Sequence, residues 1–243
     1  MTRRIDWELA VTGQTAFIFP GRGAYVPGAL AGVVSEDVRR TLNELDSVVA
    51  AYGLAPVSTM VAGPGAPSLG ELLVAAPERI DPAIYATSVC LATILERERG
   101  IVPDVVSGHR LGEVAALAVA GVLTVGDGMR VVCEDAAKRF GTPVSLGRPR
   151  VRCWSPRTRR YVTSGDEGSG LLYERGAGPV GFMSTARFLY ADGITRFVEC
   201  GARALLTLLT LDCLPRATAL TAEQVLCPTS ERRRAGRAQA GDW

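Results

Sequence analysis

The chain has 243 residues, of which 47% are hydrophobic and 21% charged, so it carries enough apolar material for the core of one globular domain. Its formal net charge of +2 is too small to indicate nucleic acid as the main partner. Six scattered cysteines without a Cys-x-x-Cys pair, together with a single histidine (His109), exclude a zinc site. The sequence has no signal-peptide pattern and no apolar run long enough for a membrane span. We therefore expect a soluble, cytoplasmic protein without metal or cofactor.

The first third of the chain predicts one strand and two helices. Residues 15–24, TAFIFPGRGA, indicate a short buried strand that runs into a glycine-rich turn. An apolar stripe predicts an amphipathic helix over residues 35–53. A further helix is expected over residues 80–100, with Asp81 as its N-cap and Pro82 at the first helical position.

The middle of the chain continues the alternation and then changes in texture. Residues 102–108 predict a strand, residues 111–123 a buried helix, and residues 125–140 an amphipathic helix. From 141 to 178 glycine, proline, serine and arginine dominate, and one strand is expected around residues 150–154.

Regular patterns return near the C-terminus. A helix is expected over residues 182–193, a strand over 194–201 and another helix over 202–214. We place one domain at residues 15–212 and a disordered tail at 213–243. The alternation of strands and helices predicts an α/β fold with a mostly parallel sheet.

The stretch VVSGHRLGEVAALAVAGVL, residues 105–123, has the shape of a nucleophile elbow. Gly108 and Gly112 flank position 110 in the Gly-x-Ser-x-Gly frame, in which a sharp strand-to-helix turn lifts a nucleophile into a pocket. Arg110 stands where the serine is expected. Two glycines around one residue also occur by chance, so the weight of this motif depends on its strand–turn–helix context.

Four stretches, in order, resemble signatures of the malonyl-CoA:acyl-carrier-protein acyltransferase family, the acyltransferases of fatty-acid and polyketide synthesis. The resemblance covers most of residues 15–211. The four stretches are FIFPGRGA (17–24), IDPAIYATSVCLATIL (80–95), GHRLGEVAALAVAGVL (108–123) and STARFLYADGITRFVECGARALLTLL (184–209).

This resemblance implies an α/β-hydrolase-like large domain with a parallel sheet. It also implies that the ferredoxin-like small subdomain usually inserted into that domain is missing here, with the deletion near residues 140–143. The family transfers an acyl group from malonyl-CoA or another acyl-CoA to the phosphopantetheine of a carrier protein, through an acyl-serine intermediate. The partners that it implies are an acyl carrier protein or a polyketide or fatty-acid synthase subunit, with no nucleic acid and no membrane.

The residues at the family's functional positions have changed. Arg110 replaces the nucleophile, and a guanidinium cannot be deprotonated in a protein, so it cannot attack a thioester. Asp135 falls where an arginine grips the malonyl carboxylate. Arg22 and Asp81 fall where the family has glutamines. The catalytic histidine is missing with the small subdomain, because His109 is only the neighbour of the elbow position.

The resemblance places an oxyanion hole at the main-chain N–H groups of Arg22 and Leu111, which do not depend on side-chain identity. We expect Arg110 to form an ion pair with Asp135, because a positive charge at a helix N-terminus is unfavourable. For Arg22 and Asp81 an ion pair is one alternative. The one we favour is independent roles, with Arg22 in solvent and Asp81 as an N-cap.

Three other features have simple interpretations. Cys133 and Cys200 are expected to pack in the core, and Glu113 to serve the first turn of its helix. The arginine-rich segment 148–160 either contacts an acidic carrier protein or forms a solvated loop, and we favour the loop.

Three classes of function remain. We favour a catalytically inactive homologue that acts by binding a carrier protein or synthase partner. The alternatives are an enzyme that still handles acyl-CoA by a non-standard site, with Arg110 anchoring a carboxylate or phosphate, and a truncated remnant without function.

Overall fold

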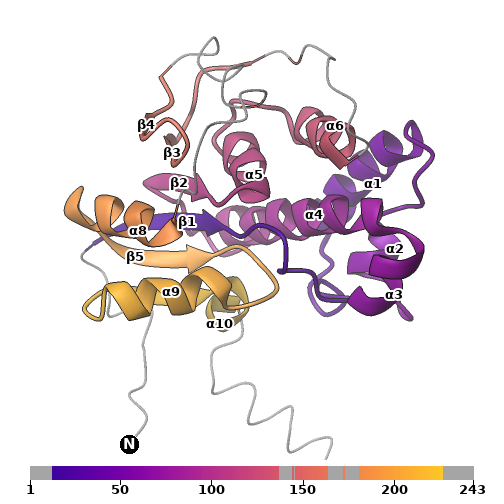
Figure 1. The fold of residues 1–243 in the computed structure, drawn as a ribbon, viewed down its shortest axis with the longest axis horizontal. Coiled ribbons are helices and arrows are strands. Elements are labelled where there is room, and N and C mark those ends of the chain that lie inside the picture. The colour runs from indigo at the N-terminus through magenta and orange to yellow at the C-terminus, as the bar shows by residue number, and fades with distance from the viewer. Residues whose placement is uncertain (1–12, 137–143, 145, 164–171, 173–180, 227–243) are drawn as a thin grey trace, which may run out of the picture.

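The computed structural model describes residues 13–136, 144, 146–163, 172 and 181–226. In this part of the chain six strands form one sheet in the order β4-β3-β2-β1-β5-β6 (Figure 1). All neighbouring strands are parallel except β3 and β4, which are antiparallel. The predicted α/β fold with a mostly parallel sheet is therefore confirmed. The strands are β1 (Gln14–Phe19), β2 (Val105–Gly108), β3 (Arg152–Ser155), β4 (Arg160–Tyr161), β5 (Ile194–Glu199) and β6 (Thr218–Thr221).

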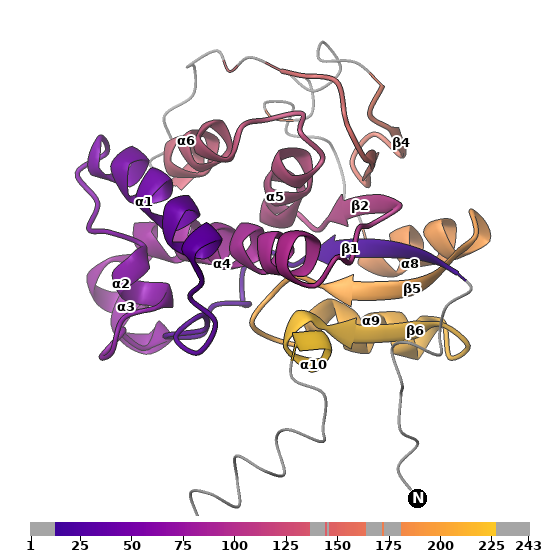
Figure 2. The same ribbon diagram turned by 180° about the vertical axis from the view of Figure 1, so that it is seen from behind.

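Helices cover both faces of this sheet. The helices α1, α4, α5 and α6 lie on one side, and α8 and α9 on the other (Figures 1 and 2). A 3-10 turn (Pro77–Arg79) leads into α4, and a π-helical turn (Ile94–Glu98) continues it. The helices are α1 (Glu36–Ala50), α2 (Ser58–Val61), α3 (Leu69–Ala75), α4 (Ile80–Thr93), α5 (Leu111–Val119), α6 (Val125–Ala136), α8 (Phe182–Ala191), α9 (Leu205–Cys213) and α10 (Ala222–Leu226).

The central strand β1 explains why both faces are covered. Side chains alternate between the two faces of a strand. Phe17 and Phe19 belong to the larger core cluster, formed with α1, α4, α5 and α6, whereas Ala16 and Ile18 belong to the smaller one, formed with α8 and α9. All four are fully buried, so the strand reads as a continuous apolar run, as expected for a parallel strand between two layers.

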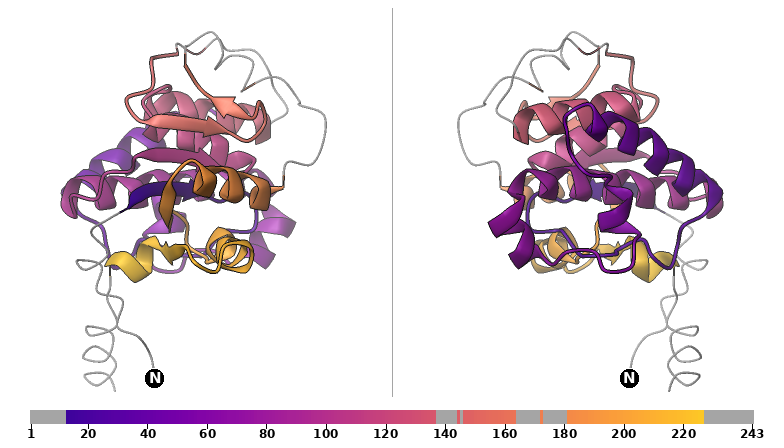
Figure 3. Two further views of the ribbon diagram at one scale, coloured as in Figure 1. Left: turned by 90° about the vertical axis from the view of Figure 1, so that its left-hand side faces the viewer. Right: turned by 90° about the vertical axis from the view of Figure 1, so that its right-hand side faces the viewer.

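The register of the sheet brings several chain segments to one edge. Phe19 at the end of β1 pairs with Gly108 at the end of β2, and Ser107 pairs with Trp154 near the end of β3. Because parallel strands end at the same edge, the turn after β1, the elbow after β2 and the end of β3 meet there. Figure 3 shows the β3–β4 hairpin at one end of the molecule, and α9 and α10 at the other.

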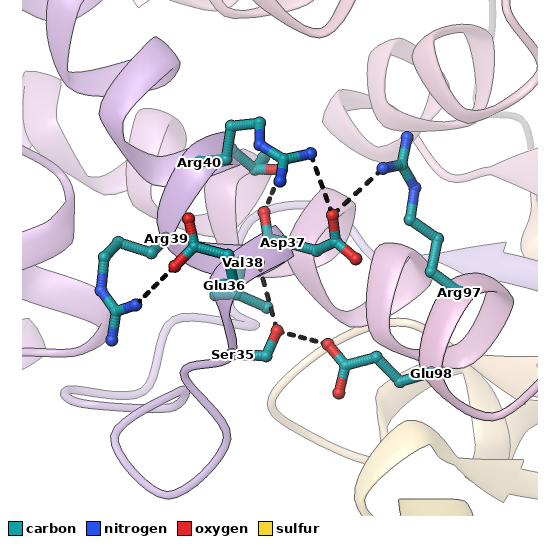
Figure 4. A network of polar contacts seen from close by, with 9 residues as sticks. Ser35, Glu36, Asp37, Val38, Arg39, Arg40, Arg97 and Glu98 are labelled. Atoms are coloured by element: carbon teal, nitrogen blue, oxygen red, sulfur yellow. Dashed lines mark hydrogen bonds and ion pairs between the residues drawn. The ribbon is translucent and has the colours of Figure 1, made fainter.

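Helix α1 is fixed at its start to the π-helical turn. Ser35 is the N-cap, and its hydroxyl accepts a hydrogen bond from the N–H of Val38 at 3.3 Å. The same hydroxyl donates to Glu98, and Arg97 forms an ion pair with Asp37 at 3.2 Å (Figure 4). These contacts hold α1 against the C-terminal end of the α4 segment.

The C-terminal part of the fold differs from the sequence-based expectation. The predicted disordered tail began at residue 213, but β6 pairs in parallel with β5, and α10 follows directly. The folded domain therefore extends at least to Leu226 rather than ending at residue 212. Residues 227–243 lie outside the described residues. The predicted deletion near 140–143 also lies outside them and stays a prediction.

Helices α2 and α3 and strand β4 had no counterpart among the predicted elements. Each is short, so its periodicity carries little signal. Among the described helices, none combines the length and the apolar character needed to cross a lipid bilayer.

Candidate functional site

The elbow between β2 and α5 keeps the sharp turn that the sequence predicted. Arg110 has a φ of 56° and a ψ of −114°, which is outside the regions that side-chain-bearing residues favour. Among the described non-glycine residues only Arg159 shares a positive φ. A strained backbone of this kind costs about 1–3 kcal/mol and persists only where its surroundings impose it.

Two glycines impose the turn. A Cβ on Gly108 would stand 2.0 Å from the carbonyl oxygen of Gly112, and a Cβ on Gly112 would stand 2.0 Å from the carbonyl oxygen of Phe19. Strand β2, helix α5 and strand β1 therefore approach closely enough that only glycine fits at both positions. The spacing of the two glycines in the sequence thus reports main-chain packing.

The turn after β1 lies directly beside the elbow. A Cβ on Gly21 would stand 2.7 Å from the carbonyl oxygen of His109 and 3.6 Å from the Cβ of Arg110. The N–H groups of Arg22 and Leu111 have no hydrogen-bond acceptor among the described residues. The N–H of Leu111 is free because it is the first residue of α5. Their use as an oxyanion hole stays a prediction.

Arg22 and Asp81 form an ion pair, so the favoured expectation of independent roles is wrong. The Nε of Arg22 donates to Oδ1 and Oδ2 of Asp81 at 3.0 and 2.8 Å, and its Nη2 donates to Oδ2 at 2.5 Å. The Asp81 side chain is 7% exposed and that of Arg22 70%. Asp81 is not an N-cap either, because Arg79 occupies the N-cap position of α4.

The field around Arg22 extends to a second carboxylate. Its hydrogen bonds and attraction to Asp81 raise the pKa of Arg22 above the usual value, and Asp135 adds to that rise. Asp135 therefore helps to stabilise the charge of Arg22. Arg22, Asp81 and Asp135, three of the four charged residues that the sequence resemblance singled out, belong to this one group.

The expected ion pair between Arg110 and Asp135 is absent from the described residues. Both side chains are exposed, and Arg110 forms no ion pair or side-chain hydrogen bond with a carboxylate in this part of the chain. Its exposure explains why it needs none, since a charge in solvent is well screened even at a helix N-terminus. Arg110 therefore presents an exposed guanidinium at the tip of the elbow.

His109 is half-buried beside Arg110, and its ring meets Phe182 edge-on at 6.4 Å between centroids. Burial lowers the pKa of His109, and the charge of Arg110 lowers it further. Its imidazole is therefore neutral at neutral pH.

Glu113 has partners that sequence reasoning missed. It lies in the first turn of α5, as expected, but its Oε1 accepts a hydrogen bond from the buried Ser155 hydroxyl at 2.6 Å. Arg157 forms an ion pair with its Oε2 at 3.5 Å. Burial raises the pKa of Glu113, and these two partners oppose the rise. The carboxylate thus fastens the β3–β4 hairpin to the elbow helix.

The arginine-rich segment 148–160 is tied into the domain at several points. Arg150 binds Glu96 at 3.2 Å and the carbonyl oxygen of Val119 at 2.9 Å. Arg152 forms an ion pair with Asp192 at 3.0 Å. The solvated loop that we favoured does not describe these side chains, because they join the hairpin to neighbouring elements.

The candidate nucleophilic cysteines lie in the core, as expected. Cys133 and Cys200 are 2% and 0% exposed. Burial raises the pKa of Cys133 to about 12 and that of Cys200 well above its usual value, so neither thiol ionises at neutral pH. No group of metal-ligating side chains large enough to hold an ion occurs among the described residues.

Comparison with known proteins gives a consistent result. The chain matches the acyl transferase domain family over residues 16–141. It is 38% identical over 153 residues to erythronolide synthase EryA3 of Saccharopolyspora erythraea, which covers 59% of this chain and 4% of that synthase. It is 35% identical over 123 residues to the pikromycin polyketide synthase component PikAIII of Streptomyces venezuelae, covering 49% and 8% respectively. The chain thus spans a small fraction of these relatives.

Solved structures show the same fold at low sequence identity. The malonyl CoA-acyl carrier protein transacylase of Coxiella burnetii has a TM-score of 0.74 at 18% identity, covering 88% of this chain and 96% of its own. A loading acyltransferase of the avermectin modular polyketide synthase also has a TM-score of 0.74 at 18% identity, covering 93% and 99%. A malonyl-transacylase in complex with its type II polyketide synthase acyl-carrier protein has a TM-score of 0.71 at 18% identity, covering 86% and 95%.

Proposed function

Because the chain belongs to the acyl transferase domain family, we propose that it is an acyltransferase homologue of polyketide or fatty-acid biosynthesis that no longer performs ping-pong acyl transfer. It acts instead by binding an acyl carrier protein or a synthase subunit. The observation that carries this proposal is Arg110, held at the tip of an intact elbow where the family requires a nucleophile. A guanidinium offers no lone pair for attack on a thioester, because it stays protonated in a protein.

The neighbouring residues support loss of the chemistry. Two positions that hold glutamines in the family are occupied by Arg22 and Asp81, and these are bound to each other. The one histidine of the chain, His109, lies next to the elbow position and contacts Phe182. A nucleophile, a base and a carboxylate-binding arginine are needed together for malonyl transfer, and none stands at its family position.

The relatives support the proposed partner class. Those with the matching sequence are polyketide synthases, and a structure of the same fold is a complex of a malonyl-transacylase with an acyl-carrier protein. Because a fold does not by itself fix a function, the partner class belongs to the proposal and is tested directly by binding.

The test is incubation of the full chain with labelled malonyl-CoA and a phosphopantetheinylated carrier protein, followed by mass spectrometry of both proteins. An active malonyltransferase serves as the positive control under identical conditions. We expect no acyl adduct on the chain and no carrier loading above the rate without protein. An adduct or accelerated loading overturns the inactive reading.

Binding is measured separately on the same two proteins. Titration calorimetry or pull-down with purified carrier protein, or with a purified synthase subunit, is expected to show association without acylation. Absence of association with every partner of both classes removes the binding part of the proposal.

A further inference from the structure

Helix α9 is oriented with its hydroxyl side chains inward. Thr207 and Thr210 are buried, and their hydroxyls donate to Oε2 of Glu199 at 2.8 Å and to the carbonyl oxygen of Leu206 at 2.7 Å. Glu199, at the end of β5, also accepts from the N–H groups of Leu205 and Thr207 at 3.1 and 2.8 Å. The polar face of this helix is therefore satisfied inside the protein.

Four of the five leucines of α9 point outward, whereas Leu206 is buried in the smaller core cluster. Leu205, Leu208 and Leu209 have the spacing i, i+3 and i+4, which places residues on one side of a helix. Leu211 lies one turn beyond Leu208. In Figure 1, β5 is seen between α8 above it and α9 below it, and both helices belong to the smaller core cluster. An exposed apolar surface of this kind on a folded domain marks an interaction site. This leucine face consists of Leu205 (37% exposed), Leu208 (64%), Leu209 (40%) and Leu211 (40%).

Three exposed arginines, called here the arginine rim, lie on α8 and just beyond the two ends of α9. Arg203 precedes α9 and Arg216 follows it. Arg187 of α8 lies near Cys213, the last residue of α9. Burial raises the pKa of the Cys213 thiol, and the positive charge of Arg187 opposes that rise. These three arginines form no ion pair with any described residue. Asp212, the only acidic residue of α9, is exposed and lies one turn beyond Leu208, so three arginines against one aspartate leave the surroundings of the leucine face with a net positive charge.

The leucine face begins beside the candidate site. A Cβ on Gly23 would lie 3.9 Å from a terminal methyl group of Leu205. Gly23 belongs to the turn after β1 that also carries Arg22. A partner seated on α9 would therefore reach the rim of the elbow without any rearrangement of the domain.

We propose that the leucine face and its arginine rim form a docking surface for an amphipathic helix whose polar residues are acidic. A helix with leucine-like side chains along one side packs on the leucine face, and its carboxylates meet Arg187, Arg203 and Arg216. A second copy of this chain fits poorly, because its own arginine rim would face the same charges. This helix is taken to belong to the carrier protein or synthase partner, and in that respect the inference rests on the proposed function.

The probe is a fluorescent peptide of about 18 residues, long enough for five helical turns. It has leucines at helical i, i+3, i+4 spacing and glutamates at the other positions. The control peptide has the same leucines with lysines in place of the glutamates. Both are titrated with the full chain, and anisotropy is measured at low and at raised salt.

We expect the acidic peptide to bind, and the lysine peptide to bind at least about tenfold more weakly. The double variant Leu208→Ser, Leu209→Ser weakens binding of the acidic peptide by at least about tenfold. Arg203→Glu weakens it too and removes part of its salt dependence. The matched control is Leu73→Ser, Val74→Ser on α3, where the two side chains are 60% and 89% exposed, and it leaves binding unchanged.

Several results would overturn the docking surface. They are equal binding of the two peptides, no effect of the α9 double variant, or an equal effect of the α3 control. Two further results would identify another occupant and would also overturn the proposal. One is self-association of the chain, measured by sedimentation, that Leu208→Ser abolishes. The other is binding of the chain to phosphatidylserine vesicles but not to the peptide. Acyl transfer overturns the proposed function instead and leaves the peptide result standing.

Discussion

Arg22 joins the turn after β1 to the first turn of α4 by holding the carboxylate of Asp81 through three N–H···O contacts across 59 residues of sequence. The two partners are unequal, since the carboxylate is nearly buried and the arginine is mostly in solvent. Removing one partner therefore has a different consequence from removing the other. Without Arg22, the Asp81 carboxylate would stay buried and out of reach of water, whereas without Asp81 the guanidinium would be hydrated.

Arg22→Ala is expected to lower the free energy of unfolding by about 1–3 kcal/mol, because it leaves the Asp81 carboxylate buried and unpaired. Asp81→Asn is expected to cost less than about 1 kcal/mol, since the freed guanidinium turns to solvent. Urea unfolding of both variants and of the double variant measures the difference. A larger loss for Asp81→Asn than for Arg22→Ala would contradict the burial that the structure assigns to the pair.

Gly112→Ala should destabilise the fold by at least about 2 kcal/mol. The added methyl group would meet the carbonyl oxygen of Phe19 at 2.0 Å, and a main-chain atom cannot give way as a side chain can. Gly32→Ala is the matched control, because a Cβ there meets nothing within 4 Å. Comparable thermal unfolding midpoints for the two variants would mean that the elbow is not packed against β1.

Replacements at position 110 separate backbone strain from charge. Arg110→Ala and Arg110→Gly both remove the guanidinium, but only glycine adopts a φ of 56° with a ψ of −114° without strain. We expect the glycine variant to be more stable than the alanine variant by about 1 kcal/mol, after its larger unfolded-state entropy is allowed for. If chemical denaturation showed the alanine variant to be the more stable of the two, the positive φ that the structure assigns to position 110 would be contradicted.

The raised pKa of Glu113 has a consequence for stability against pH. The folded protein binds the proton of the Glu113 carboxyl group more tightly than the unfolded chain does. The contribution of this group to the free energy of unfolding is therefore fully present below pH 4.5, the ordinary pKa. It is lost as the pH rises through the higher pKa of the folded state. Glu113→Gln mimics the protonated form. The variant should therefore gain stability relative to the parent as pH rises from below 4.5 toward neutrality.

Unfolding free energies of both proteins measured across that pH range provide the check. A relative loss of stability by the glutamine variant as pH rises would show that Ser155 and Arg157 outweigh burial, so that the pKa of Glu113 is lowered.

Restoring a hydroxyl at the elbow should not restore catalysis. Arg110→Ser supplies a hydroxyl at the elbow, but the one histidine of the chain precedes it in the same turn. The family resemblance also places Asp135, an anionic side chain, where an arginine would bind the malonyl carboxylate. We expect labelled malonyl-CoA to leave no adduct on this variant, as on Arg110→Ala. A serine-linked adduct found by peptide mass spectrometry would reveal a base that the chain does supply.

The longer elements of the fold could be predicted from the sequence because their apolar periodicity is strong. The apolar stripe of α1 and the buried run of β1 are examples, and the elbow was recognisable from Gly108 and Gly112. Strand β6 was missed because four residues carry almost no period, and its pairing with β5 supplies the order that its own pattern does not show.

The contacts of the site were less predictable than its positions. Family resemblance located Arg22, Asp81 and Asp135, but it does not say toward which carboxylate an arginine turns. The partners of Glu113 depend on the register of β2 against β3, two strands separated by α5 and α6 in the sequence. That register is a property of the folded sheet, and no local pattern encodes it.

The backbone at position 110 is set by two glycines against neighbouring main chain, and so it does not depend on the side chain displayed there. This makes the position a ready attachment point for engineering. Arg110→Cys would present a thiol at the tip of a rigid turn. Cys133 and Cys200 stay shielded in the core, whereas the partly exposed Cys213 would first be replaced by serine. A spectroscopic label or crosslinker placed there would report which molecules approach this edge of the sheet.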